Sequence, residues 1–571
     1  MVETKQGKTE SETGKPEAET TKHEAGEFAP VPVRSGKNPQ PGPLRRLATF
    51  LARVFGPGEL TLGGGRTPAI LAGVASAAAM MVRLFVPGPV GMGDQGDGHG
   101  LVCALGVSNV RPWDYAEFTR FIYPGWTPHQ FAGEACGAVG SGEAVYSSQL
   151  AFLWLGKLIT PVFGWGPGVD MRAVGIVCCL VFGLLTAALV AVLPGRASFR
   201  ILIAALVTAV MADGVFADFF ISPYPEPAAF LGTLAVLVAL LHYWNGRGSR
   251  WLAIVWVVGA GIFTIAAKAE MVSWLPVLAL ALLWRPHVPS RRSGRRVPET
   301  RWWRQRIVPF AAIMVLAAFA VAFLAVQPKR TSELNVYNAV FAELLPNSPV
   351  PEDDLKWLGL DPGFLSASGT TVASPRSAAV NPKFSEFQEQ VGPAKLAGFY
   401  VTHPERLIGV GERGITAMLT PELGYIGSFM EGQGHDPFDK DRRFPVVLGL
   451  FTALKAVPVA LVAMQLLTLL LGFAVAFRKK SAVGRLAVVV VVAGWLQFWV
   501  VMLGSGQPEI YRQLVISGFH AALCVPLLVA LISILASEPR KLMLQQPEPG
   551  VQEPGTSEPS AATLRDPAVS V

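Results

Sequence analysis

The sequence predicts an all-α polytopic membrane protein with about ten transmembrane helices and a mainly helical extracytoplasmic loop domain. Three observations support this fold class. Of the 571 residues, 51% are hydrophobic and only 16% are charged, and the mean hydropathy is +0.41. Apolar runs recur at about the 20 residues that a helix needs to cross a bilayer. Short basic clusters separate these runs, as in the cytoplasmic loops of membrane proteins. Such a composition excludes a string of soluble domains.

The chain begins with a polar segment. Residues 1–44 are rich in Glu, Lys, Thr, Gly and Pro and almost free of aromatic residues, so we expect a disordered cytoplasmic tail. This start predicts no cleavable signal peptide. Residues 44–55 are basic and amphipathic, which is typical of a helix lying on the cytoplasmic membrane surface.

Ten apolar stretches set the domain boundaries. The first seven belong to an N-terminal transmembrane module over residues 45–326, and the last three fill residues 446–536. A loop domain of residues 327–445 separates the two groups, and residues 537–571 form a Pro/Glu/Ser-rich tail that we expect to be disordered. The predicted spans are 67–87, 171–193, 199–217, 227–244, 251–269, 271–285, 307–326, 446–476, 484–503 and 515–536.

The basic clusters predict the orientation. With the N-terminus in the cytoplasm, residues 285–306, which carry eight arginines, and residues 478–485 both lie inside, as the positive-inside rule requires. Both termini are then cytoplasmic, and the loops 88–170 and 327–445 are extracytoplasmic. High usage of Ala, Val, Gly and Arg is typical of a high-GC bacterium, so we expect a multi-pass protein of a bacterial plasma membrane.

Both extracytoplasmic loops contain apolar periodicity. Residues 334–345 and 388–418 have apolar side chains at helical spacing, which predicts helices within the loop domain. Residues 147–165 are apolar on one side and interrupted by Pro161. This pattern favours an interfacial helix over a further span.

The first candidate site follows the first span. Residues 90–100, VGMGDQGDGHG, place Asp94, Asp97 and His99 among five glycines. Glycine lets a backbone turn tightly or approach a ligand closely. Carboxylates at such a place can act as a general base, hold a metal ion, or be solvated in a turn, and these alternatives stay open at this point.

Further charged residues gather at the predicted extracytoplasmic face. Charge is costly at the bilayer centre, so this distribution predicts a site assembled from several helix ends. The alternative is that the positive-inside bias leaves acids outside by default. Arg83 is expected to reach the membrane surface or to contact a lipid phosphate, and Glu270 is too close in sequence to face Lys268 on a helix. The remaining candidates are Asp213, Asp218, Glu226, Glu509 and Arg512.

Several classes of site are absent from the sequence. There is no Gly-rich phosphate loop, no Ser nucleophile elbow and no His/Cys spacing for a metal, and the eight histidines are scattered, which argues against a zinc enzyme. No cofactor is indicated, although a divalent cation held by Asp94 and another acid stays open. The net charge of +7 is not a nucleic-acid signature. Cys103 and Cys136 share one loop, and whether they form a disulfide is left open.

These residues resemble the GT-C superfamily of membrane glycosyltransferases. The GDQGD of residues 93–97 is similar to the Gly-Asp-Asn-Gly-Asp motif of bacterial hexosyltransferases of cell-surface glycan assembly, with Gln95 in place of the Asn. The stretches 339–360 and 399–407 and the turn 508–514 add to the resemblance, which covers about residues 67–536.

The resemblance implies inverting transfer of a sugar from a polyprenyl-phosphate donor to a glycan or glycolipid acceptor at the extracytoplasmic face. Asp97, or else Asp94, would take the proton of the acceptor hydroxyl. Arg512 and Lys268 would stabilise the leaving polyprenyl phosphate. The other members of the site would bind substrate: His99, Asp213, Asp218, Glu226, Glu270 and Glu509.

Two other classes of function compete with this interpretation. A transporter or lipid-linked-glycan flippase predicts charged or broken helices at mid-membrane and an internal repeat, and neither is visible. A non-catalytic protein of envelope assembly predicts that loss of Asp97 leaves envelope glycans unchanged.

Overall fold

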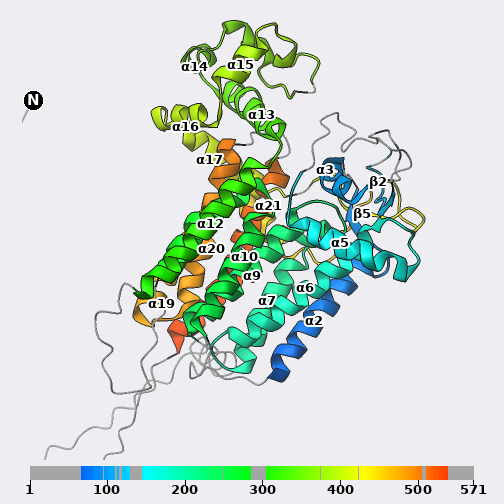
Figure 1. Ribbon diagram of the computed structural model, residues 1–571, viewed down its shortest axis with the longest axis vertical. Helices are drawn as coiled ribbons and strands as arrows, with labels where there is room; N and C mark the ends of the chain where they lie inside the picture. Colours follow the sequence, from blue (N-terminus) through cyan, green and yellow to red (C-terminus); the bar gives the residue numbers. More distant parts are fainter. Residues whose placement is uncertain are drawn as a thin grey trace, which may run out of the picture. The chain divides into compact units, whose positions relative to one another are not determined.

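The computed structural model describes residues 66–93, 96–109, 112, 114, 117, 119–128, 145–246, 249–284, 304–372, 374–421, 423–504 and 510–537. This part of the chain is mostly helical (Figure 1), which confirms the predicted fold class. The predictions for residues 1–44, for 44–55 and for the tail beyond 537 lie outside the described residues. The same holds for the pairing of Cys103 with Cys136.

Seven helices of the described residues are long and apolar enough to cross a membrane. A multi-pass membrane protein is therefore confirmed, although the predicted count of ten is not. These helices are α2 (Arg66–Phe85), α6 (Met171–Val192), α9 (Glu226–Asn245), α12 (Arg304–Ala325), α19 (Val459–Arg478), α20 (Ala482–Gly504) and α21 (Ile510–Ala536).

The other predicted spans are helical but shorter or broken. Helix α7 (Ala197–Met211) is followed by α8 (Gly214–Ala217) and the 3-10 turn η4 (Asp218–Phe220). The chain bends by 68° between α7 and α8, and the two parts count as an eighth candidate span only if they cross the membrane together. Helices α10 (Arg250–Ile265), of 16 residues, and α11 (Trp274–Leu283), of 10 residues, fall short of a full crossing. The predicted span 446–476 is divided into α18 (Val446–Lys455) and α19 at Pro458, which has no N–H for a continuous helix.

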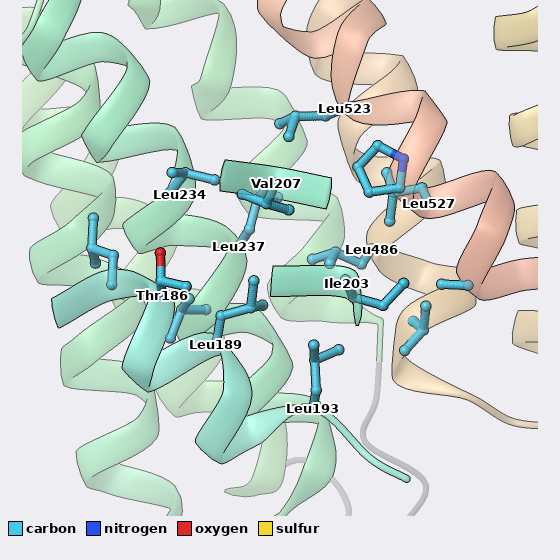
Figure 2. A pocket seen from close by; sticks show the side chains of 15 residues that line it. Thr186, Leu189, Leu193, Ile203, Val207, Leu234, Leu237, Leu486, Leu523 and Leu527 are labelled. Atoms are coloured by element: carbon cyan, nitrogen blue, oxygen red, sulfur yellow. The ribbon is translucent and has the colours of Figure 1, made fainter. Parts of the chain in front are cut away.

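The helices pack around an apolar centre. Helix α6 lies against α2, α9 against α10, and α19, α20 and α21 against one another. Where α6, α7, α9, α20 and α21 meet, they leave a cavity of about 40 Å³ (Figure 2). Its one hydroxyl belongs to Thr186 and donates to the Phe182 carbonyl at 2.9 Å. This cavity has no polar group free for chemistry, so it is a small packing defect of the core.

The loop domain is helical where the periodicity predicts it. A buried group of aromatic rings, including Tyr337, Phe341 and Phe387, packs at its centre. Figure 1 shows α13 to α16 grouped beyond one end of α12. The elements are α13 (Lys329–Tyr337), the π-helix η7 (Asn338–Leu344), η8 (Leu345–Asn347), α14 (Pro351–Leu358), η9 (Pro362–Ala367), η10 (Ala378–Val380), α15 (Phe384–Gln390), α16 (Pro393–Thr402) and α17 (Arg406–Met418).

Short strands, which the sequence pattern did not predict, connect the loops. Strand β1 (Val90–Met92) pairs antiparallel with β5 (Ile426–Phe429), so the segment after α2 lies beside the end of the loop domain. A second sheet has the order β2 (Val107–Asn109), β3 (Gly125–Pro128), β4 (Val169–Asp170). The intervening helical pieces are η1 (Gly96–Gly98), α3 (His99–Val102), η2 (Cys103–Leu105), α5 (Gln149–Ile159), η3 (Thr160–Phe163) and η5 (Ala269–Ser273).

Candidate functional site

The Asp-containing loop begins where β1 ends. Pairing of Val90 with Phe429 and of Gly91 with Ser428 fixes the strand that leads into it. Asp94 lies outside the described residues. Asp97 is at the centre of η1, and only its backbone is described. The structure therefore gives the backbone position of Asp97 alone, and the roles of both predicted bases stay predictions.

Close backbone contacts hold this loop against its neighbours. The Gly93 N–H donates to the Tyr425 carbonyl at 2.7 Å. A Cβ on Gly91 would stand 2.7 Å from the Ile221 carbonyl oxygen, and a Cβ on Gly98 would overlap the Pro223 ring. These glycines are needed for close approach, because the loop lies directly on the turn that runs from Ile221 to the start of α9.

His99, a predicted substrate-binding residue, follows Gly98 at the start of α3. Its ring centroid lies 4.8 Å from that of Trp126, which is 1% exposed. This packing fixes the end of the loop. The sequence predicted that His99 lies in the loop, but no sequence pattern predicted its contact with Trp126.

A second group of predicted residues meets around Lys268. The Lys268 amine lies 3.4 Å from the Glu226 carboxylate and 3.8 Å from that of Glu270, and it donates to the Gln513 side chain at 3.0 Å. We call these four residues the Lys268 cluster. Lys268 has an extended backbone and precedes η5, so the expectation that Glu270 cannot face it is wrong.

Arg512 lies beside the Lys268 cluster in α21. Residues 510–514 belong to the stretch 508–514 that was expected to be a turn, and they are helical. The guanidinium carbon of Arg512 lies 4.9 Å from the ring centroid of Tyr224, which is close enough for a cation–π contact. Tyr224 follows Pro223, so the same turn contacts both the Asp-containing loop and Arg512. Glu509, next to this helix, lies outside the described residues.

Asp213 makes structural contacts. Its carboxylate accepts hydrogen bonds from the backbone N–H groups of Val215 at 3.0 Å, Val447 at 2.6 Å and Leu448 at 3.1 Å. It therefore caps α8 and α18 together. These bonds occupy its oxygens and favour a role in holding the bend after α7.

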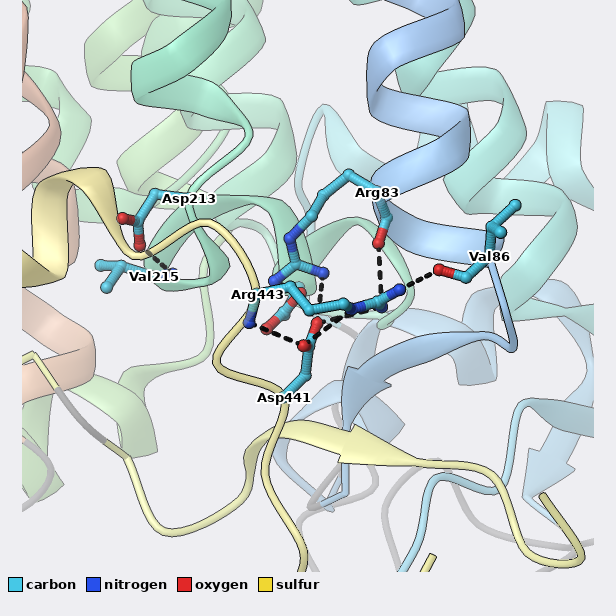
Figure 3. Close-up of polar contacts among 7 residues, drawn as sticks. Arg83, Val86, Asp213, Val215, Asp441 and Arg443 are labelled. Carbon is cyan, nitrogen blue, oxygen red and sulfur yellow. Dashed lines mark hydrogen bonds and ion pairs between the residues drawn. The ribbon is translucent and has the colours of Figure 1, made fainter. Parts of the chain in front are cut away.

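Asp218 belongs to a buried network around Arg83. The Arg83 guanidinium lies 3.1 Å from the Asp218 carboxylate and 2.6 Å from that of Asp441, and all three side chains are at most 6% exposed. Arg443 pairs with Asp441 and donates to the carbonyls of Arg83 and Val86 (Figure 3). The expectation that Arg83 reaches the membrane surface is wrong, because carboxylates from two distant segments satisfy its charge.

This network borders a cavity of about 250 Å³. Lys440 lines it and donates to the Ser428 hydroxyl at 2.8 Å. Burial lowers the pKa of the Lys440 amine to about 8, because the ammonium loses hydration. Sequence reasoning missed Lys440, Asp441 and Arg443. Their signal is the charged run of residues 439–443 immediately before an apolar stretch.

The predicted acids thus form two groups joined by one turn. Asp213 and Asp218 lie at the Arg83 network, whereas Glu226 and Glu270 lie in the Lys268 cluster. Within the described residues, no three His, Cys, Asp or Glu side chains lie close enough to hold a metal ion. The loop that contains Asp97 contacts the turn between these two groups through Gly91 on Ile221 and Gly98 on Pro223.

Comparison with protein families gives a match over most of the chain. Residues 61–548 match a family described as the YfdI N-terminal transmembrane domain. No curated protein matches it, and neither does any solved structure.

Proposed function

We propose that this chain, which belongs to the family of the YfdI N-terminal transmembrane domain, is an integral membrane glycosyltransferase of the GT-C type. In this proposal it moves a sugar from a polyprenyl-phosphate donor to a cell-envelope glycan or glycolipid at the extracytoplasmic face of a bacterial plasma membrane. The confirmed multi-pass fold agrees with a donor that arrives within the membrane. The GDQGD motif of residues 93–97, together with Arg512 and the Lys268 cluster, supports the proposed sugar transfer.

The reaction needs a base and a cation. The acceptor hydroxyl oxygen attacks the anomeric carbon of the sugar while Asp97, or else Asp94, takes the hydroxyl proton. The bond between the anomeric carbon and the phosphate oxygen breaks, and the electron pair leaves with the polyprenyl phosphate. Attack opposite the leaving group inverts the anomeric configuration. Arg512 and Lys268 would stabilise the charge on the phosphate.

One observation carries the proposal. The turn from Ile221 to Tyr224 contacts the Asp-containing loop through Pro223 and Arg512 through Tyr224, and it leads directly into Glu226 of the Lys268 cluster. In this proposal the base and the two cations come from three distant parts of the chain, whose contacts with this turn are made by Gly98, Arg512 and, through Glu226, Lys268. Arginine is suited to bidentate phosphate binding, so in this proposal the acceptor and the leaving group meet at this turn.

A transfer assay tests the proposal. The full-length chain is reconstituted in vesicles with a radiolabelled polyprenyl-phosphate sugar and an acceptor fraction from envelope membranes. We expect label to pass to the acceptor with the wild type and not with an Asp94→Asn/Asp97→Asn double variant. Asp361→Asn, which alters an exposed acid of the loop domain, is the matched control.

Two results would contradict the proposal. Label that crosses the vesicle bilayer while remaining on the donor lipid would favour the flippase alternative. Equal transfer by wild type and double variant would exclude the Asp-containing loop as the catalytic site.

A further inference from the structure

A half-buried lysine lines the cavity beside the Arg83 network. Lys440 is one of the residues around this cavity of about 250 Å³. Among the described residues, its amine contacts the Ser428 hydroxyl at 2.8 Å and pairs with no carboxylate. Burial lowers the pKa of this amine to about 8, so most of it is still an ammonium at pH 7. A partly desolvated ammonium without a counter-charge is costly.

The other buried charges around this cavity already have partners (Figure 3). Two guanidinium groups pair with two carboxylates, which are those of Arg83, Arg443, Asp218 and Asp441. The Asp213 carboxylate accepts three backbone hydrogen bonds. Arg442 is exposed, so water solvates its guanidinium. Within the described part of the chain, a bound anion would therefore act mainly on Lys440.

The backbone around Lys440 is held in an unusual conformation. Phe438 and Phe444, on either side of it, have φ values of 69° and 61°. Bulky side chains rarely adopt this left-handed region, and such strain persists only where the surrounding structure imposes it, often at ligand sites. An antiparallel bridge between Ser428 and Lys440 fixes this segment against β5. The lysine is thus held in place at the cavity.

This cavity lies at one end of the Asp-containing loop. A Cβ on Gly93 would stand 2.9 Å from the Ser428 hydroxyl oxygen that accepts the hydrogen bond of Lys440. At the other end of the loop, the turn that contacts Gly98 also contacts Arg512. Two different cationic groups therefore flank the two ends of the loop.

We infer that this cavity binds an anionic group, a phosphate or a carboxylate, of the acceptor glycan or glycolipid. The inference rests on the proposed transferase activity, which assigns the donor phosphate to Arg512 and Lys268 at the other end of the loop. Lysine has three N–H donors, and Ser428 takes one of them, so the others can bond to oxygen atoms of the anion. A neutral acceptor would leave the ammonium without a counter-charge, so Lys440 selects for anionic acceptors.

Labelling of the amine tests the site without sugar transfer. The full-length chain in detergent is treated at pH 8 with a limiting amount of acetic anhydride, and the labelling of each lysine is measured by peptide mass spectrometry. We expect inorganic phosphate to slow the labelling of Lys440 severalfold and saturably, relative to chloride at equal ionic strength. Lys383, which is exposed and pairs with Asp361, is the internal control and should react equally in both salts.

Acceptor preference tests the assignment to the acceptor. Envelope acceptors are separated by anion exchange into neutral and anionic fractions, and KM for each fraction is measured in the transfer assay. We expect the wild type to prefer the anionic fraction. Lys440→Met should raise KM for that fraction about tenfold, as expected for the loss of one charge-assisted hydrogen bond, with KM for the donor unchanged. Lys440→Arg keeps the charge and should keep the preference, and Lys383→Met should behave as wild type.

Four results would overturn the inference. Equal labelling of Lys440 in phosphate and chloride would show that the cavity takes no anion. A higher KM of Lys440→Met for the donor alone would assign the cavity to the donor phosphate. Equal use of both fractions by the wild type would exclude selection by charge. Absence of transfer to every fraction would contradict the proposed function and with it the acceptor, whereas protection of Lys440 by phosphate would still establish an anion site. The unfolding midpoint of each variant shows whether it is folded.

Discussion

At the scale of single residues, contacts separate the predicted site residues by role. Asp213 caps two helices through three backbone hydrogen bonds. Arg512 instead lies on the Tyr224 ring, next to the turn that holds the Asp-containing loop. Residue type alone did not distinguish these roles, because both residues are charged and lie near helix ends.

Arg512→Lys should lower kcat/KM for sugar transfer by about 10²-fold. Lysine keeps a positive charge but loses the planar, multidentate donor set that suits a phosphate, and losing one stabilising donor costs about this factor. Transfer rates measured at several donor concentrations check the prediction. Arg442→Lys, at an exposed position, is the matched control, and an unchanged rate for Arg512→Lys would exclude contact with the leaving group.

Lys440 should make the protein more stable as pH rises from about 8 to about 10.4. Burial lowers its pKa to about 8, whereas an unfolded lysine titrates near 10.4. In this window the unfolded chain binds the additional proton, so the free energy of unfolding rises with pH. The charged residues sharing its cavity are Asp213, Asp218, Asp441, Arg442 and Arg443.

Unfolding midpoints of wild type and Lys440→Met between pH 7 and 10.5 measure this effect. The variant should lack the rise that this lysine causes. Lys383→Met should keep it, because the contact with Asp361 raises the pKa of Lys383. The same pH dependence in wild type and Lys440→Met would show that this amine is not the cause.

At the scale of elements, the length and periodicity of the apolar runs predicted the helices. They did not predict how the loops between the helices pair and bend. Helices α2, α6 and α20 lie where the apolar runs are. Strand β1 has three residues and β5 has four, and more than 300 positions separate them in the sequence. No local sequence pattern therefore predicts that they pair. The bend after α7 depends on Asp213 binding to α18, which is a tertiary contact.

Gly98→Ala should lower the unfolding midpoint and the transfer rate together. The added methyl group overlaps the Pro223 ring, and overpacking of this kind costs about 1–3 kcal/mol. Thermal unfolding in detergent and the transfer assay measure both effects. Gly125→Ala, where a Cβ meets no atom within 4 Å, should behave as wild type. A fully active, stable Gly98→Ala protein would show that the loop does not need this contact.

At the scale of the whole molecule, the number of spans decides the topology. Seven described helices satisfy the length and composition criteria, or eight with the bent pair. An odd number of spans places the two termini on opposite sides of the membrane, and an even number of spans places them on the same side. The basic clusters at residues 285–306 and 478–485 predict an even number of spans with both termini in the cytoplasm.

Reporter fusions at the two termini test this topology. A reporter that is active only in the cytoplasm should give a signal at both ends, because the bent pair α7–α8 then counts as a span. A fusion after residue 350 in the loop domain should give none. A signal from only one terminus would contradict the parity predicted by the charges.

The proposed base can be tested most directly by comparing Asp97→Asn with Asp361→Asn in single-turnover transfer from the polyprenyl-phosphate sugar. The amide keeps the size of the carboxylate but cannot take the acceptor proton. We predict that Asp97→Asn lowers the rate by about 10²–10⁴-fold with donor binding and unfolding midpoint retained, while Asp361→Asn stays within about twofold of wild type. A wild-type rate for Asp97→Asn would contradict the assignment of Asp97 as the base.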